Sequence, residues 1–175
     1  MNNAYETVIG LEVHVQLNTK SKIFCGDSTY FGSEPNTLVS AISLAHPGTL
    51  PKINKALIPK VIRLGIALDC KINPSSTFDR KAYFYPDLPK GYQITQDKNP
   101  VLIGGYLELD SGSRIRMHHA HLEEDAGKSI HHLHPDKTLL DYNRAGTPLL
   151  EIVTEPDFRS GEQVEEFIYL SLIHI

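Results

Sequence analysis

Residues 8–17 read Val8-Ile9-Gly10-Leu11-Glu12-Val13-His14-Val15-Gln16-Leu17, and apolar side chains occupy every second position from Ile9 onward. In an extended chain, successive side chains point to opposite faces, so this period of two is typical of a half-buried β-strand. The apolar face is expected to pack on a core. The other face carries Glu12, His14 and Gln16, which makes it an ionisable surface.

Further strands are predicted later in the chain. A second alternating segment ends at Pro156-Asp157 and has Leu149, Glu151, Val153 and Glu155 on one side and Leu150, Ile152 and Thr154 on the other. It gives a second strand face with carboxylates. Residues 101–109 and 114–122 are expected to form a hairpin across the turn Asp110-Ser111-Gly112-Ser113.

Helices are predicted in two places. Residues 54–69 have apolar side chains at helical spacing, although Pro59 must either start the helix or kink it. Ser160-Gly161-Glu162-Gln163 has the form of a capping box, so a second helix is expected to begin there. Residues 20–51 are rich in Gly and Pro and indicate a structured loop region. Strands, few helices and many turns together predict an α+β fold.

Composition limits the class of protein. The chain has 175 residues, 41% of them hydrophobic, which suits one domain or part of a larger one. A net charge of −4 argues against a surface that binds nucleic acid over its whole extent. Cys25 and Cys70 are the only cysteines, so a disulfide scaffold is not expected. There is neither a long apolar stretch nor a basic leader before an apolar run, and we therefore expect a cytoplasmic protein without a membrane segment.

Common nucleotide and hydrolase motifs are missing. Gly127-Lys128-Ser129 resembles the end of a P-loop, but Leu122 stands where the first glycine of that motif belongs. The sequence also lacks G-x-G-x-x-G, H-E-x-x-H and G-x-S-x-G, which removes support for nicotinamide, zinc-protease and serine-hydrolase chemistry.

Carboxylates are frequent on the predicted strands. Two carboxylates about 4 Å apart repel by ~4 kcal/mol at an effective dielectric constant near 20, so acids that converge need protonation, a basic partner or a cation. Oxygen-rich sites with an imidazole suit Mg²⁺ or Mn²⁺. The alternative is that these acids lie on separate solvated faces and never meet. The acids and the histidine concerned are Glu12, His14, Glu123, Glu124, Asp125, Asp141, Glu151 and Glu155.

Histidines and one lysine raise further possibilities. A metal site could be formed by the histidines at His118, His119, His121, His131, His132 and His134, but we expect most of them to be surface residues near a turn. His121, beside the acidic run, is the exception. Asp87-Leu88-Pro89-Lys90-Gly91 places Lys90 in a rigid turn among aromatic residues, where it would suit contact with a phosphate.

Four long motifs stand in the sequence at residues 8–17, 78–94, 122–128 and 141–153. In their order and spacing they resemble the B subunit of the glutamyl/aspartyl-tRNA amidotransferases, and the resemblance runs from about Tyr5 to about Glu166. It implies a cradle domain of the glutamine synthetase/guanido kinase type with an antiparallel sheet, present here over residues 1–170 and truncated. Residues 171–175 do not resemble the expected continuation and are interpreted as an atypical or artefactual tail. The helical tRNA-binding region of the family is expected to be absent from this chain.

The resemblance also implies an activity. Members are ATP-dependent ligases in which the side-chain carboxylate of misacylated Glu-tRNA(Gln) or Asp-tRNA(Asn) takes the γ-phosphoryl group of ATP and ammonia then attacks. The expected cofactors are ATP and Mg²⁺, and the expected partners are the glutaminase A subunit and the C subunit of a bacterial heterotrimer, together with the misacylated tRNA. The implied metal shell is Glu12, His14, Glu124 and Glu151, with Glu123 and Asp125 as further candidates; Lys90, Lys128 and Arg144 are expected to contact phosphate.

Departures from the family pattern produce further expectations. Many relatives have a four-cysteine zinc pattern where this chain has Cys25, Asp27, Ser40 and Ser43, so we expect no zinc. A truncated domain alone is expected to be marginally stable and inactive. Two alternatives stay open: the related archaeal subunit specific for Glu-tRNA(Gln), and a non-catalytic scaffold that binds tRNA or a partner protein.

Overall fold

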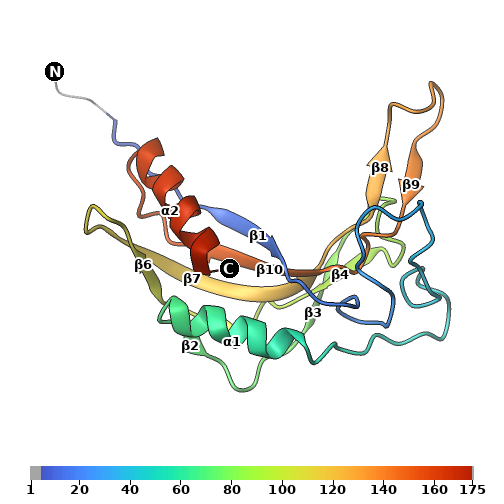
Figure 1. Ribbon diagram of the computed structural model, residues 1–175, viewed down its shortest axis with the longest axis horizontal. Coiled ribbons are helices and arrows are strands. Elements are labelled where there is room, and N and C mark those ends of the chain that lie inside the picture. The colour runs from blue at the N-terminus through green and yellow to red at the C-terminus, as the bar shows by residue number, and fades with distance from the viewer. Residues whose placement is uncertain (1–4, 175) are drawn as a thin grey trace.

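The computed structural model describes residues 5–174, and it has the expected α+β architecture. Figure 1 shows long curved strands at the centre, with α1 running along them and α2 near one end. Within the described residues the elements are β1 (Glu12–Gln16), α1 (Leu57–Ala67), β2 (Lys71–Ile72), β3 (Asp79–Ala82), β4 (Tyr92–Thr95), β5 (Leu102–Ile103), β6 (Tyr106–Glu108), β7 (Arg114–Glu124), β8 (Lys128–Ile130), β9 (Leu139–Asp141), β10 (Pro148–Thr154) and α2 (Gly161–His174).

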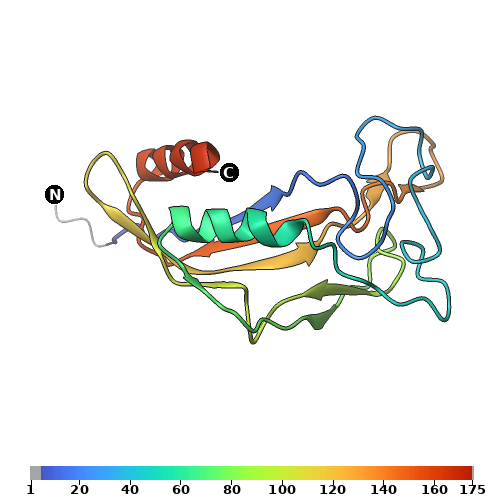
Figure 2. The same cartoon turned by 60° about the horizontal axis from the view of Figure 1, so that its bottom comes forward.

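The main sheet is antiparallel throughout, with strand order β1-β10-β7-β5-β2 and with β6 paired to β7. The first predicted strand therefore pairs with the last one, and the last one pairs in turn with the long strand β7. Two hairpins, β3–β4 and β8–β9, stand outside this sheet. Figure 2 shows β8–β9 and the 20–51 loop region gathered at the end of the molecule opposite to α2.

One face of the sheet carries the core. Leu122 of β7 and Leu150 and Ile152 of β10 are almost completely buried there, and both helices contribute side chains to the same cluster. Gly65 of α1 packs so close to β5 that an added Cβ would lie 2.5 Å from a methyl carbon of Leu102. The expected apolar face of β1 joins this core through Val13 and Val15, which are partly buried.

A bulge at His118 lets β7 keep the same face toward the core on both sides of that residue, with Met117 buried before it and Ala120 buried after it. Met117 pairs with Thr154 and His119 pairs with Val153, so one residue of β7 has no partner at that point. Gly104 and Gly105, both with positive φ, lie opposite this bulge and divide the predicted strand 101–109 into β5 and β6. The hairpin turn at 110–113 lies where the sequence predicted it.

The helix boundaries resolve the question raised by Pro59. α1 begins at Leu57, which places Pro59 in the first turn, where a backbone N–H has no partner within the helix. The helix therefore neither kinks nor starts at the proline. α2 begins after Ser160, whose Oγ accepts from the Gln163 N–H, as the capping box predicts. α2 extends through His174, so residues 171–174 of the expected atypical tail are helical, and Ile175 lies outside the described residues.

Candidate functional site

The face of the sheet opposite the core is polar where β1, β10 and β7 lie side by side. Strand register brings side chains from the three strands into rows across this face. His14 pairs with Glu151, and Glu151 pairs with His121, so Glu151 lies at the centre. The neighbouring rows are Glu12, Val153 and His119 on one side, and Gln16, Leu149 and Glu123 on the other.

Acids and imidazoles meet at this centre. The Nε2 atom of His14 lies 3.1 Å from an oxygen of Glu151, 3.2 Å from an oxygen of Glu123 and 3.8 Å from an oxygen of Glu12. The Nε2 atom of His121 lies 3.5 Å from Glu151 and 3.6 Å from Glu123. We call these five residues the acidic cluster: Glu12, His14, His121, Glu123 and Glu151.

Burial and charge act in opposite directions within the acidic cluster. Burial raises the pKa of Glu151, and the nearby carboxylates of Glu123 and Glu12 add to that rise. Burial also acts to raise the pKa of Glu123, but a hydrogen bond and charge from His121, with charge from His14 and Lys81, outweigh it and lower that pKa. A cation placed between these two acids would stabilise the ionised form of Glu151, which burial and its neighbours disfavour.

The donor atoms of the acidic cluster fit a metal ion. Glu12, His14 and Glu151 each offer a ligand atom within 4.8 Å of the others, and His121, Glu123 and Glu151 do the same. Glu151 belongs to both sets. Oxygen donors supplemented by imidazole suit a divalent cation such as Mg²⁺ or Mn²⁺. The alternative that the acids lie on separate faces does not apply to Glu12, Glu123 and Glu151.

Glu124 departs from the expected metal shell. Adjacent residues of a strand point to opposite faces, so Glu124 points away from Glu123 and into the protein. Both of its oxygens accept from Lys90, and Oε1 also accepts from the Ile94 N–H at 2.9 Å. Burial raises the pKa of Glu124, and Lys90 acts against that rise. The predicted grouping of Glu124 with Glu12 and Glu151 is therefore not the arrangement in the structure.

Lys90 is consequently not a free cation at a phosphate site. Its ammonium group pairs with Glu124 and lies over the rings of Phe24 and Tyr92, at 5.9 Å and 5.8 Å from their centres. The turn that carries Lys90 ends in Gly91, whose φ of +71° suits glycine. The predicted position among aromatic residues is present, but the expected free charge is neutralised.

His121 is the member of the acidic cluster that the sequence only partly indicated. Its side chain is buried and shares a strand face with Glu123, two residues further along β7. His119 is next on the same face, and its Nε2 lies 3.0 Å from Nδ1 of His121. The remaining histidines of the two histidine-rich stretches are exposed, as expected: His118, His131, His132 and His134.

Two cavities meet at the acidic cluster. One, of about 740 Å³, is lined by cluster residues together with Lys81 and the aromatic residues 83–85. The other, of about 690 Å³, is lined by the histidines of β7, Lys81, Lys98 and Gln96. Lys81 and Glu151 line both cavities. The Gln96 Nε2 atom is the one buried side-chain polar atom without a partner among the described residues, and it is a hydrogen-bond donor.

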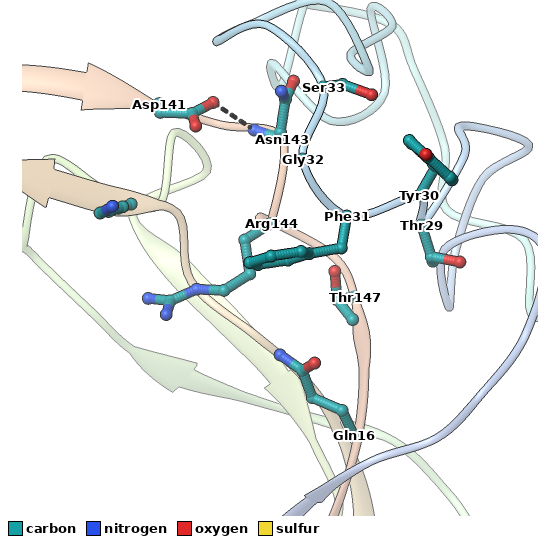
Figure 3. A pocket seen from close by; sticks show the side chains of 11 residues that line it. Gln16, Thr29, Tyr30, Phe31, Gly32, Ser33, Asp141, Asn143, Arg144 and Thr147 are labelled. Carbon is teal, nitrogen blue, oxygen red and sulfur yellow. Dashed lines mark hydrogen bonds between the residues drawn. The ribbon is translucent and has the colours of Figure 1, made fainter.

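A third cavity, of about 450 Å³, lies beyond Gln16 at the end of the polar face. It brings together two of the predicted phosphate contacts, Lys128 and Arg144. Figure 3 shows Gln16, Phe31 and Arg144 entering it from three different segments. Asp125 borders this cavity rather than the acidic cluster, because it accepts from Gln16 Nε2 at 3.0 Å and lies 3.5 Å from Nε of Arg144.

The four positions of the expected cysteine pattern also meet in space. The Asp27 carboxylate accepts from the backbone N–H and the hydroxyl of Ser40, each at 2.9 Å, and from the hydroxyl of Ser43. The Cys25 sulfur lies 3.5 Å from the Ser43 oxygen. Hydrogen bonds centred on Asp27 therefore join the parts of the 20–51 loop region at this point.

Within residues 5–174, no helix is both long and apolar enough to cross a membrane.

A family model described as the GatB/GatE catalytic domain matches residues 7–173. The chain is 58% identical over 167 residues to the B subunit of the aspartyl/glutamyl-tRNA(Asn/Gln) amidotransferase from Saccharophagus degradans, a match that covers 93% of this chain and 35% of that relative. The protein of the same name from Cellvibrio japonicus matches with the same identity and coverage. The one from Neisseria meningitidis serogroup B is 55% identical over 173 residues, covering 97% of this chain and 36% of that relative.

Proposed function

This chain belongs to the GatB/GatE catalytic domain family, and we propose that it forms the catalytic part of the B subunit of an ATP-dependent amidotransferase acting on misacylated tRNA. It spans 35% to 36% of the length of the curated relatives that it matches. In the proposed reaction, the side-chain carboxylate of Glu-tRNA(Gln) or Asp-tRNA(Asn) attacks the γ-phosphorus of ATP and ADP leaves. Ammonia then attacks the acyl phosphate, and inorganic phosphate leaves the resulting amide.

The acidic cluster is the observation that carries this proposal. Glu12, His14, Glu123 and Glu151, with His121, are the proposed ligands of Mg²⁺. When bound, Mg²⁺ supplies the positive charge that allows an anionic carboxylate to approach an anionic triphosphate. The residues themselves need only hold that charge in place, because phosphoryl transfer depends mainly on positioning and electrostatics.

We place the triphosphate of ATP in the two cavities that share Glu151. Lys81 lines both and offers a cation close to the acidic cluster. Gln96 Nε2 lacks an acceptor, and a phosphate oxygen would provide one. Phe84 and Tyr85 are 86% and 71% exposed at the rim of the larger cavity, which suits stacking of the adenine ring.

The family also supports a wider assignment. We propose that the partners are a glutaminase A subunit and a C subunit, that the complex works in a bacterial cytoplasm, and that the full domain is a cradle of the glutamine synthetase/guanido kinase type. The curved antiparallel sheet in Figure 1 is compatible with that shape.

The proposal is tested in the full-length protein assembled with its partner subunits. Glu12→Gln and Glu151→Gln remove a charge from the acidic cluster at nearly constant volume. We expect each to abolish ATP-dependent amide formation and to weaken Mn²⁺ binding, measured by titration calorimetry, while the glutaminase activity of the partner persists. Glu108→Gln is the matched control, because Glu108 is exposed and its one ion pair within the described part of the chain is with Arg114 at 3.0 Å.

Two results would contradict the assignment. Full amide formation by both cluster variants would show that the acidic cluster is not the catalytic centre. A wild-type complex without Mg²⁺-dependent ATP binding would instead favour a scaffold that binds tRNA or a partner, with the chemistry elsewhere.

A further inference from the structure

The third cavity is separate from the two that share Glu151. It is lined by Phe31, Lys128, Arg144 and Thr147 among others, and Gln16 connects it to the acidic cluster. Gln16 and His14 are two residues apart on the same face of β1, which corresponds to about 7 Å along a strand. A ligand in this cavity would therefore lie beside the acidic cluster without occupying it.

Exposed aromatic rings mark the mouth of this cavity. Phe31 is 96% exposed and Tyr30 is 73% exposed, although both line a concave site. A large apolar ring held in water is available for stacking against another flat group. Bases of single-stranded nucleic acid stack on such rings, and this kind of stacking tolerates any base.

The charges of the cavity suit a phosphate. Lys128 is exposed and makes no ion pair among the described residues. Arg144 donates Nε to the carbonyl of Ala126 and an Nη to that of Gly127, and these bonds fix its guanidinium at the cavity wall. Its Nε also lies 3.5 Å from the Asp125 carboxylate, which offsets part of its charge, so Lys128 supplies the unpaired charge. Asp141 also lines the cavity, but its carboxylate already accepts from the backbone N–H groups of Asn36 and Asn143.

We propose that this cavity binds the terminal nucleotide of the RNA substrate, with the base on Phe31 and the phosphate near Lys128 and Arg144. The inference rests on the proposed function, because an amino acid esterified to the last ribose has to extend from a bound terminal nucleotide to the metal site nearby. A cavity one step along β1 from the acidic cluster meets that requirement. A free nucleotide such as ATP shares the base-and-phosphate chemistry, so the test has to separate the two sources.

The test measures binding of tRNA to the full-length complex, with and without the last nucleotide of the tRNA. Fluorescence anisotropy of labelled deacylated tRNA gives the affinity and needs neither ATP nor catalysis. Removing a stacking platform is expected to weaken binding of the intact tRNA by about 5- to 150-fold in Phe31→Ala. The shortened tRNA should bind wild type weakly, and Phe31→Ala should not weaken its binding further.

Further variants identify the source of the ligand. Lys128→Ala is expected to weaken the binding of intact tRNA, as Phe31→Ala does. Lys137→Ala is its control, because it removes the same charge in the β8–β9 hairpin loop, outside the cavity, and should leave tRNA binding unchanged. The KM for ATP should rise in Phe84→Ala and stay unchanged in Phe31→Ala. An increase of the KM for ATP in Phe31→Ala would assign the cavity to free nucleotide and overturn the inference.

The inference would also be overturned if Phe31→Ala weakened the binding of intact and shortened tRNA equally, or weakened neither. These outcomes differ from a failure of the proposed function, which would appear as a wild-type complex that forms no amide with ATP. If the wild-type complex is active and Phe31→Ala binds intact tRNA with the same affinity as wild type, only the cavity assignment is refuted.

Discussion

Replacing Lys90 by Met should destabilise the folded chain strongly, because the buried carboxylate of Glu124 would lose its counter-ion. The side chain of Glu124 is 3% exposed and that of Lys90 is 14% exposed, so water can replace little of the lost interaction. After the change, Glu124 keeps the Ile94 N–H as a donor but not the charge of Lys90. Breaking one partner of a buried ion pair costs about 3–5 kcal/mol in the free energy of unfolding. That is a large part of the roughly 5–15 kcal/mol available to a domain.

A double variant isolates the charge from the packing. Adding Glu124→Gln to Lys90→Met removes the unpaired charge and leaves an oxygen that still accepts from Ile94, so at least about 2 kcal/mol should return. Urea unfolding followed by far-UV circular dichroism and tyrosine fluorescence measures these changes, since the chain has eight Tyr and no Trp. Lys52→Met, at an exposed lysine, controls for the substitution itself.

Acidic pH should rescue Lys90→Met. Burial raises the folded-state pKa of Glu124, and Lys90 is the main influence that opposes this. A carboxyl group with a raised folded-state pKa favours folding below its ordinary pKa, and that contribution is lost as the pH rises through the folded-state value. The deficit of the variant should therefore shrink as the pH falls. A loss below about 1 kcal/mol at neutral pH, or a double variant no more stable than the single one, would refute the role of the pair.

Other predictions concern the backbone, the thiols and zinc. Gly105→Ala should cost more than about 2 kcal/mol in the free energy of unfolding, because its φ is +94° and the new Cβ would lie 2.4 Å from the Leu68 carbonyl oxygen. The control is Gly112→Ala, where φ is +80° but the surrounding space is open, and it should cost only about 1 kcal/mol. Burial raises the pKa of the Cys70 thiol from 9.0 to about 11, so at pH 8 its alkylation, followed by peptide mass spectrometry, should be roughly 100-fold slower than in the urea-unfolded chain. Equal rates in both states would contradict this. We expect less than stoichiometric zinc by mass spectrometry of the purified protein, because Asp27, Ser40 and Ser43 offer one carboxylate and no thiolate beside Cys25.

The fold elements followed from local patterns, whereas their pairing did not. Alternation at 8–17 and 149–155 predicted strands, because the period of two depends only on neighbouring residues. For 8–17 it also predicted the apolar face that packs on the core. The pairing of β1 with β10 depends on the whole chain, and no spacing in the sequence indicates it. Glu155 was expected to share the face of Glu151, but β10 ends at Thr154 next to the bulge at His118.

The type of site could be predicted from the sequence better than the identity of the residues that form it. Glu12, His14, Glu123 and Glu151 converge as the family resemblance implied, whereas the density of carboxylates alone left open that they never meet. Glu124 was misplaced because three consecutive acids cannot all face the same side of a strand, and the sequence does not show which one turns inward. The cavity at Phe31 combines residues from the 20–51 loop region and from around β8 and β9, so only the folded chain reveals it.

The order of the sheet also determines when the site can exist. Glu12 and His14 lie on the strand made first, yet the bond from the Leu11 N–H to Thr154 that closes β1 onto β10 spans 143 residues. A ribosome adding about 5–20 residues per second leaves β1 without its partner strand for on the order of ten seconds. During that interval β1 lacks the strand that covers its edge. A nascent chain that ends before residue 148 would lack Glu151 and the whole of β10, the strand that lies between β1 and β7.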